Sequence, residues 1–233
     1  MHYDATPRSR ARTTICVSSQ VGCPIGCSFC ATGQSGFDRN LNEAEIVDQF
    51  LMASRDLGQG PGALTNVVFM GMGEPMNNYT AVVGAIRRWA RSDTLNFSPR
   101  RVTISTIGLV PFMERLTAEG LPVNLAISLH APNDELRSRL IPVNRKYPIA
   151  AITAAARAHA ERTSRRISYE YVLLHDVNDS LEQARQLAAL VNHRLSHVNL
   201  MISTTIRATR GLDIDAACGQ LRARELQTMP SPV

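Results

Sequence analysis

Three cysteines lie within one short segment near the start of the chain, Cys23-Pro-Ile-Gly-Cys27-Ser-Phe-Cys30. Three thiolates on such a loop can bind three irons of a 4Fe-4S cluster and leave the fourth iron open to another ligand. Phe29, between the last two cysteines, can shield a cluster or stack on a cofactor. A structural zinc site usually takes four ligands, commonly from paired Cys-x-x-Cys motifs, and no fourth Cys or His stands at a suitable spacing. We therefore predict that Cys23, Cys27 and Cys30 bind a 4Fe-4S cluster, with a zinc site and cysteines unrelated to metal binding as the alternatives.

The other two cysteines stand apart from this segment. Cys16 precedes it on an apolar run, and Cys218 lies near the C-terminus. The total of five cysteines is odd, and the first residues lack a basic-then-apolar signal pattern. A secreted disulfide framework is therefore not expected. Metal binding or redox chemistry is the better interpretation of these cysteines.

The composition is that of a globular protein, with 44% hydrophobic and 19% charged residues. No apolar run reaches the roughly 18–20 residues of a membrane span, so we expect no membrane segment and a cytoplasmic location. The net charge is +5, and Lys146 is the single lysine among 25 basic residues, which leaves 24 arginines. Arginine suits contacts with phosphates and bases, so this bias favours an RNA partner. Codon bias in a GC-rich genome is the alternative explanation.

Six apolar runs with strand character alternate with five helical segments. This alternation implies an α/β fold with a parallel sheet and right-handed crossovers, and six units indicate a partial (β/α)6 barrel similar to a TIM barrel. In such folds functional groups gather at the C-terminal ends of the strands. The predicted strands are 13–18, 66–71, 101–106, 123–129, 167–174 and 197–201, and the predicted helices are 42–56 (capped by Asn42), 79–91, 110–119, 149–161 and 181–191.

Two segments do not fit this alternation. Residues 1–12 are polar, and we expect a frayed start there. The run at 197–201 passes directly into the strand-like stretch Ile202-Ser203-Thr204-Thr205-Ile206, without turn residues or a helix between them. The last β/α unit is therefore expected to be incomplete.

Several motifs resemble those of the radical S-adenosylmethionine (SAM) superfamily. The element Gly71-Met-Gly-Glu74-Pro75, at the end of the second predicted strand, is similar to the superfamily's GGEP element, which holds the amino group of SAM; a tight turn before a helix is the alternative. The resemblance extends to the RlmN/Cfr family of dual-specificity RNA methyltransferases over about residues 1–221. It is also carried by Cys16-Val-Ser-Ser-Gln-Val-Gly-Cys23, Cys30-Ala-Thr-Gly, Arg101-Val-Thr-Ile-Ser105-Thr, Ser128-Leu-His130-Ala-Pro-Asn and Asp213-Ile-Asp-Ala-Ala-Cys218-Gly-Gln-Leu.

The resemblance implies radical methylation of carbon 2 of an adenosine in rRNA and tRNA. In the family, one SAM methylates a cysteine near the C-terminus. A second SAM yields a 5′-deoxyadenosyl radical, which takes hydrogen from that methyl group, and the resulting methylene radical adds to the adenine. By position, Cys218 matches the methyl-carrying cysteine. Cys16 matches the cysteine that resolves the covalent RNA adduct, which leaves a disulfide bond.

The same resemblance implies the SAM contacts and the partners. The SAM contacts carry over to Gly73, Glu74, Ser105, Ser128, Leu129 and His130. The partners are rRNA and tRNA substrates and a reducing electron donor such as flavodoxin or ferredoxin, and we expect a monomer. Arg100, Arg101, Arg207 and Arg210 are candidates for RNA phosphate contacts, with solvated surface as the alternative.

The sequence also departs from the family. The family carries an accessory RNA-binding domain and a proton-accepting glutamate ahead of the match to Met1, and a stretch with a SAM-contacting asparagine between the matches to Met201 and Ile202. We find no counterpart of these here, and Asn199 is not expected to replace that asparagine. We expect a radical SAM core over 1–221, a tail over 222–233, no accessory domain, and little or no RNA methylation by these residues alone. Carbon-8 methylation and a non-catalytic remnant that binds a cluster or SAM are the alternatives; the contexts of residues 34–40 and Cys218 favour carbon 2.

Overall fold

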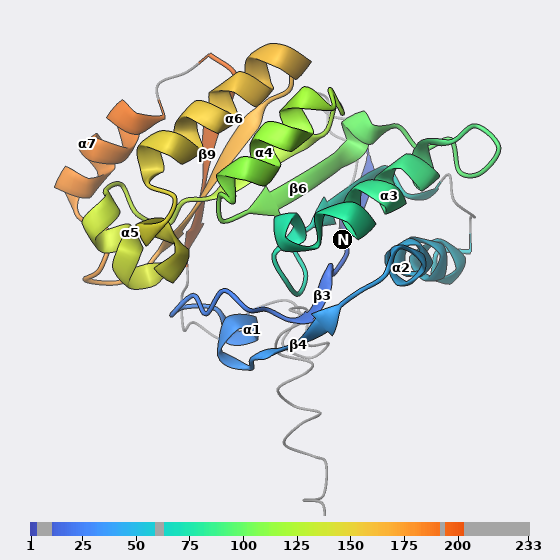
Figure 1. The fold of residues 1–233 in the computed structure, drawn as a ribbon, viewed down its shortest axis with the longest axis horizontal. Helices are drawn as coiled ribbons and strands as arrows, with labels where there is room; N and C mark the ends of the chain where they lie inside the picture. Colours follow the sequence, from blue (N-terminus) through green and yellow to red (C-terminus); the bar gives the residue numbers. More distant parts are fainter. Residues whose placement is uncertain (4–10, 59–62, 192–193, 203–233) are drawn as a thin grey trace, which may run out of the picture.

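The computed structural model describes residues 1–3, 11–58, 63–191 and 194–202. The described residues form a seven-stranded sheet in the order β1-β2-β5-β6-β7-β8-β9, in which all pairs except β1–β2 are parallel. The sheet curls into a half-barrel (Figure 1). All six predicted strands are confirmed, with bounds that differ by at most two residues. They are β2 (Arg12–Cys16), β5 (Asn66–Phe69), β6 (Val102–Thr106), β7 (Asn124–Ser128), β8 (Ile167–Leu173) and β9 (Ser196–Ile202).

The five predicted helices also form, again within two residues of the expected bounds. Asn42 caps the first of them as predicted: its side chain accepts the Glu45 N–H, and the Glu45 carboxylate accepts the Asn42 N–H. In Figure 1 the crossover helices α3, α4 and α6 lie in a row on the outer face of the sheet. The five helices are α2 (Glu43–Asp56), α3 (Tyr79–Ala90), α4 (Val110–Ala118), α6 (Ile149–Thr163) and α7 (Leu181–Leu190).

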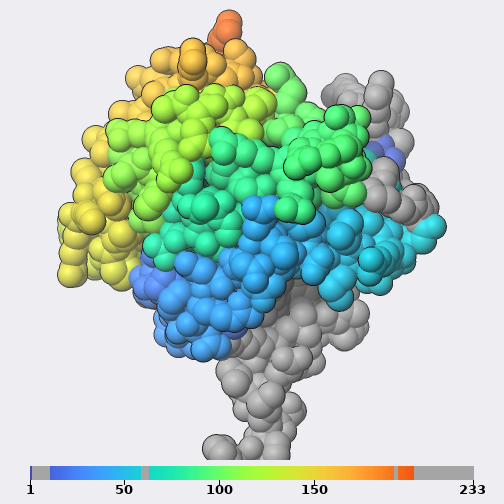
Figure 2. Space-filling view, turned by 45° about the vertical axis from the view of Figure 1, so that its right-hand side comes forward, coloured from blue at the N-terminus to red at the C-terminus, as the bar shows by residue number. Residues whose placement is uncertain are grey.

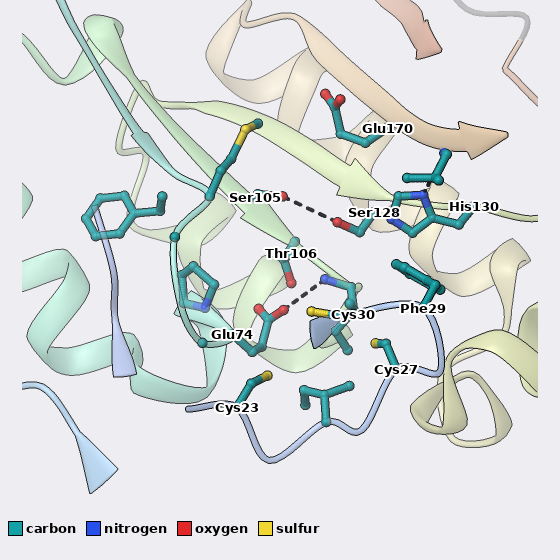
Figure 3. Close-up of a pocket in the computed structure, with 18 of the residues that line it drawn as sticks. Cys23, Cys27, Phe29, Cys30, Glu74, Ser105, Thr106, Ser128, His130 and Glu170 are labelled. Atoms are coloured by element: carbon teal, nitrogen blue, oxygen red, sulfur yellow. Dashed lines mark hydrogen bonds between the residues drawn. The ribbon is translucent and has the colours of Figure 1, made fainter. Parts of the chain in front are cut away.

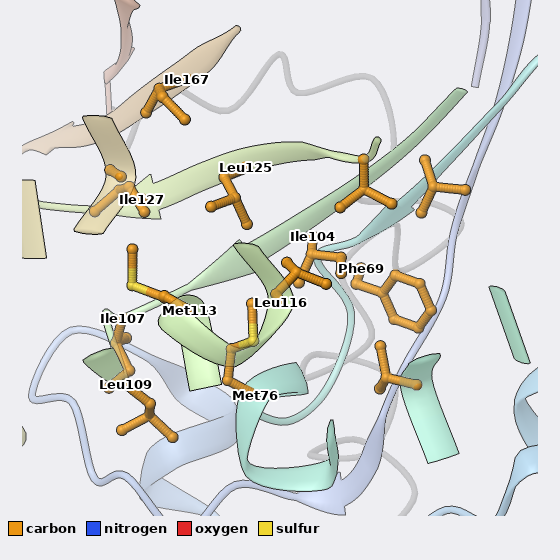
Figure 4. Packing of buried hydrophobic residues seen from close by; sticks show 14 of the residues in the cluster. Phe69, Met76, Ile104, Ile107, Leu109, Met113, Leu116, Leu125, Ile127 and Ile167 are labelled. Carbon is orange, nitrogen blue, oxygen red and sulfur yellow. The ribbon is translucent and has the colours of Figure 1, made fainter. Parts of the chain in front are cut away.

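The hydrophobic core fills the space between the strands and these helices (Figure 4). Burying one such aliphatic side chain stabilises the fold by about 1.5–3 kcal/mol. Trp89 of α3 packs between Phe50 and Phe69, with ring centroids 5.5 and 5.9 Å away. Other fully or almost fully buried members are Met76, Ile104, Met113, Leu116, Leu125, Ile127 and Ile167.

Several short elements carry too little sequence signal to be predicted. They are the hairpin of β3 (Gln20–Gly22) and β4 (Phe37–Asn40), the helices α1 (Ala31–Gln34) and α5 (Asp134–Leu140), and the 3₁₀ helices η2 (Pro75–Asn78), η3 (Pro99–Arg101) and η4 (Pro142–Arg145). In Figure 1 the hairpin and α1 lie beneath the half-barrel. In the space-filling view the blue segment that contains them lies against the teal and green segment that follows β5 (Figure 2).

The expectation of a frayed start is wrong for His2 and Tyr3. They form β1 and pair antiparallel with Thr13 and Arg12 of β2, because an edge strand requires only backbone hydrogen bonds whatever its side chains. The expected break near Met201 coincides with the end of β9, where Ile202 still pairs with Leu173 of β8. Residues 203–233, which include the expected tail, lie outside the described residues. Within the described part, no helix has the length and hydrophobicity needed to cross a membrane.

Candidate functional site

A cavity of about 290 Å³ lies at the C-terminal edge of the parallel strands (Figure 3). The cysteine loop, defined here as residues 23–30, forms one wall, and residues at the ends of β5 to β9 form the rest. Eight of the eleven predicted site residues line it, so the topology brings together motifs that are far apart in the sequence. The lining consists of Cys23, Ile25, Cys27, Phe29, Cys30, Phe69, Met70, Gly71, Gly73, Glu74, Pro75, Ser105, Thr106, Ile107, Ser128, His130, Glu170, Val172 and Met201.

Backbone hydrogen bonds anchor the cysteine loop. The Cys23 N–H donates to the Gly36 carbonyl at 2.9 Å, and the Ser28 N–H donates to the Leu140 carbonyl of α5 at 3.0 Å. Burial, reinforced by neighbouring ionisable groups, raises the pKa of Cys23 to about 11 and that of Cys27 to about 12. Ionisation of these thiols therefore needs nearby positive charge, which bound metal supplies. Among the described residues, no three His, Cys, Asp or Glu side chains converge closely enough to hold a metal ion.

A buried guanidinium stands behind the cavity wall. Arg137 of α5 is 0% exposed and donates four hydrogen bonds. The acceptors are the carbonyls of Ile107 (2.7 Å), Ser128 (2.9 Å) and Leu129 (3.0 Å) and the side chain of Asn144 (2.7 Å). Burial lowers the pKa of Arg137 to about 10, opposed by the electrostatic influence of Cys27 and Asp134. The side chain stays cationic at neutral pH and ties the ends of β6 and β7 together close to the cysteine loop.

Glu74 follows β5 and is only 3% exposed. Its carboxylate oxygens accept the N–H groups of Met76 at 3.0 Å and Ile107 at 2.9 Å. Burial raises the pKa of Glu74 to about 7, although these N–H groups and the Thr106 hydroxyl oppose the rise. The carboxylate is thus fixed in direction and lies where a cationic group in the cavity can reach it.

Hydroxyl groups and one imidazole face the cavity from β6 and β7 (Figure 3). The Oγ atoms of Ser105 and Ser128 are 3.4 Å apart. Nδ1 of His130 accepts the Val172 N–H at 3.1 Å, and its ring meets the Phe29 ring edge-on at 4.7 Å. Burial, with the Arg137 charge, lowers the pKa of His130 to about 3. The ring is therefore neutral with its proton on Nε2, which makes it a hydrogen-bond donor and not a titrating base.

Glu170 of β8 also lines the cavity, and the sequence reasoning missed it. It is 6% exposed, and its carboxylate accepts hydrogen bonds from the Ser168 hydroxyl and, at 2.8 Å, from Nδ2 of Asn199 on β9. A signal was available: Ser168, Glu170 and Val172 alternate with Tyr169 and Tyr171 along the strand. That alternation places the lone carboxylate on one face and the aromatic rings on the other.

The other predicted residues lie away from the cavity or outside the described part. Leu129 is fully buried, its N–H donates to the Glu170 carbonyl, and its own carbonyl accepts from Arg137. Cys16 is half-buried at the end of β2 and is not among the lining residues. Cys218 lies outside the described residues; within them no disulfide bond is seen.

The arginines proposed for RNA contact are also not beside the cavity. Arg100 and Arg101 belong to η3, which leads into the N-terminal end of β6, at the edge of the sheet opposite the cavity. The Arg100 carbonyl accepts hydrogen bonds from Asn124 and Arg165, and the Arg101 guanidinium lies 5.9 Å from the Phe97 ring centroid. Arg207 and Arg210 lie outside the described residues. Arg100 and Arg101 therefore lie on the side of the sheet away from the cavity.

Known proteins share both the sequence and the fold. Residues 17–188 match the profile of the Radical SAM superfamily. A Thermobifida fusca protein named "Probable dual-specificity RNA methyltransferase RlmN" is 48% identical over 248 residues, which cover 91% of this chain and 68% of that protein. The chain belongs to the RlmN family of the radical SAM superfamily. The resemblance deduced from the motifs is thereby confirmed.

Two further comparisons describe how much of the RlmN family's length is present. A Frankia alni protein of the same name is 50% identical over 91% of this chain but only 59% of its own length. The chain thus spans roughly three-fifths of the length of such curated relatives. That alignment runs over 248 residues, more than the 233 of this chain, so the relative carries residues inside the matched region that this chain lacks. A crystal structure of a radical SAM methyltransferase from Sphaerobacter thermophilus superposes with a TM-score of 0.82 at 46% identity, over 90% of this chain and 70% of that one.

Proposed function

We propose that this chain is the radical SAM core of an RNA methyltransferase that acts on carbon 2 of adenosine in rRNA and tRNA. The cavity carries the proposal, because it combines three cysteine thiols, a buried carboxylate, two serine hydroxyls and a neutral imidazole at one edge of the half-barrel. The names of the RlmN relatives, which refer to RNA methylation, support the class of substrate.

In this proposal Cys23, Cys27 and Cys30 bind a 4Fe-4S cluster. The donor set fits, because three soft thiols line one wall of the cavity and leave one iron of a cluster without a protein ligand. Arg137 adds a fixed positive charge near Cys27, which favours the thiolate form. When bound, the cluster supplies the electron for reductive cleavage of SAM. The chain's own residues hold the reactants and keep water away from them.

The opposite wall binds SAM. Glu74 and Gly73 take its amino-acid end, because Glu74 offers a buried carboxylate and Gly73 a backbone carbonyl. Ser105 and Ser128 offer hydroxyl groups as donors or acceptors, and His130 donates from Nε2. Leu129 is left out of this set, because its N–H and carbonyl are both used within the protein.

The remaining assignments rest on the family resemblance. Cys218 is proposed as the methyl carrier and Cys16 as the cysteine that resolves the RNA adduct. Thiols that must stay reduced, and a low-potential donor such as flavodoxin or ferredoxin, fit the cytoplasm. We propose that the protein acts there as a monomer.

The test uses the 233-residue protein purified without oxygen. Iron and sulfide content and the EPR spectrum of the reduced protein report the cluster, and equilibrium dialysis with labelled SAM reports cofactor binding. Mass spectrometry of nucleosides from an incubated rRNA fragment reports the product, with the Thermobifida fusca relative as positive control. Because we expect little product, the test asks which methylated nucleoside forms and not how much of it forms.

The proposal expects 2-methyladenosine as the methylated nucleoside. A product of 8-methyladenosine would assign the carbon-8 reaction instead. In a version completed with the family's upstream domain and the stretch between Met201 and Ile202, binding of the cluster and SAM without any methylated nucleoside, while the control reacts, would show a non-catalytic remnant and contradict the proposal.

A further inference from the structure

Gln20, the first residue of β3, has a side chain that is fixed at both ends. It is 1% exposed. Its Oε1 accepts the Glu74 N–H at 2.8 Å, and its Nε2 donates to Oδ1 of Asn40 at 2.7 Å. Asn40 is also the residue directly opposite Gln20 in the β3–β4 ladder. Since the Glu74 N–H can only donate, the orientation of the Gln20 carboxamide is determined.

This contact sets the direction of the peptide group between Gly73 and Glu74. No peptide bond in the described residues is cis, and in a trans peptide the N–H and the preceding carbonyl point in opposite directions. With the Glu74 N–H turned toward Gln20, the Gly73 carbonyl is turned away from it, and Gly73 lines the cavity. Within the described part of the chain, no hydrogen bond to the Gly73 carbonyl is found. Among the described residues, the Gly73 carbonyl is therefore an acceptor without a protein donor, and both Gly73 and Glu74 line the cavity.

Gly73 is also the residue that lets Gln20 come so close. Its φ is +98°, and a Cβ atom there would lie 2.5 Å from Cβ of Gln20. Any other residue would push the Gln20 side chain away from the Glu74 N–H and would be strained by the positive φ. The hydrogen bond from the Glu74 N–H to Gln20 and the positive φ of Gly73 therefore depend on each other.

We propose that Gln20 is a positioning residue for the amino-acid end of SAM. It holds the Gly73–Glu74 peptide so that the Gly73 carbonyl, together with the Glu74 carboxylate, accepts the N–H donors of the SAM ammonium group. An ammonium group has three donors and needs acceptors fixed in different directions. This inference rests on the proposed function, since it assumes that the cavity binds SAM.

The experiment compares two ligands and four proteins. Labelled SAM and 5′-methylthioadenosine, which lacks the amino-acid end, are titrated by equilibrium dialysis into the iron-loaded wild type and three variants. Gln20→Met removes the acceptor at similar size, whereas Gln20→Glu keeps an acceptor and lets the Asn40 amide turn to donate. The matched control is Gln49→Met, because Gln49 bonds both the N–H (2.8 Å) and the carbonyl (3.0 Å) of Ser18 in the same segment but, within the described residues, does not bond the Gly73–Glu74 peptide.

We expect Gln20→Met to weaken SAM binding by about tenfold, the equivalent of one hydrogen bond, and to leave methylthioadenosine binding unchanged. Gln20→Glu should restore SAM binding, and Gln49→Met should leave the ratio of the two affinities as in the wild type. Iron content and thermal midpoints identify any variant that has lost its fold. Equal losses for both ligands, or no loss in Gln20→Met, would overturn the inference. A wild type that binds no SAM would instead overturn the proposed function.

Discussion

Replacing Arg137 with methionine tests whether its buried hydrogen bonds hold the site together. The side chain joins the carbonyls of Ile107, Ser128 and Leu129 to the side chain of Asn144. Methionine has similar length and no donor, so the substitution leaves all four acceptors without this partner. We expect a less stable protein, because buried acceptors that lose their donors keep their desolvation cost.

The magnitude follows from two opposing contributions. Hydrogen bonds to a charged group contribute roughly 1.5–3 kcal/mol each, so the loss of four costs roughly 6 kcal/mol at the lower end. Methionine also removes the cost of burying the charge. Since burial lowers the pKa of Arg137 from 12.5 to about 10, that relief is roughly 3 kcal/mol at about 1.4 kcal/mol per unit. The net expected loss is therefore about 3 kcal/mol.

The assay is urea unfolding followed by the fluorescence of Trp89, the single tryptophan of the chain, which is buried between Phe50 and Phe69. With a slope of about 2–3 kcal/mol per molar urea, the midpoint should fall by roughly 1–1.5 M. The matched control is Arg139→Met on the exposed side of the same helix, which should change stability by less than about 0.5 kcal/mol. Equal midpoints for the two variants would refute the reasoning.

Three further predictions concern the cavity and the distal cysteine. Replacing all three cysteines of the cysteine loop by alanine should remove the iron, which in the wild type should be about four atoms per chain by colorimetric assay; stoichiometric zinc would contradict the cluster. Because burial raises the pKa of Glu74 from 4.5 to about 7, its folded form keeps the proton to higher pH than the unfolded form, so wild-type stability should fall by roughly 3 kcal/mol between pH 4.5 and 7. The urea midpoints of Glu74→Gln should not show this fall with pH. If the midpoints of the wild type and of Glu74→Gln changed with pH in the same way, the titrating group would not be the buried Glu74 carboxyl. In a version completed with the family's upstream domain and the stretch between Met201 and Ile202, peptide mass spectrometry should find a methyl group on Cys218, Cys218→Ala should abolish RNA methylation and Cys16→Ala should trap a covalent protein–RNA adduct; methylation that survives Cys218→Ala would exclude it as the carrier.

Much of the fold and most of the cavity could be predicted from the amino-acid sequence. The strands and crossover helices show their own periodicity and caps, and the parallel order then brings their C-terminal ends to one edge. The three cysteines lie on one short loop because covalent spacing alone keeps them together. The alternation of side chains along a strand could even have separated Leu129 from Ser128 and His130, and the place of Arg100 and Arg101 before a strand could have assigned them to the opposite edge.

The hydrogen-bond partners of Arg137, Glu170 and Gln20 are decided only by the tertiary structure. Each contacts groups that are distant in the sequence: Arg137 bonds Ile107, Glu170 bonds Asn199, and Gln20 bonds Glu74. A sequence motif records which residue types are neighbours along the chain and how many bonds separate them. Which donor meets which acceptor depends on strand register and on the packing of loops against each other, and both are set by contacts between separate elements of the fold.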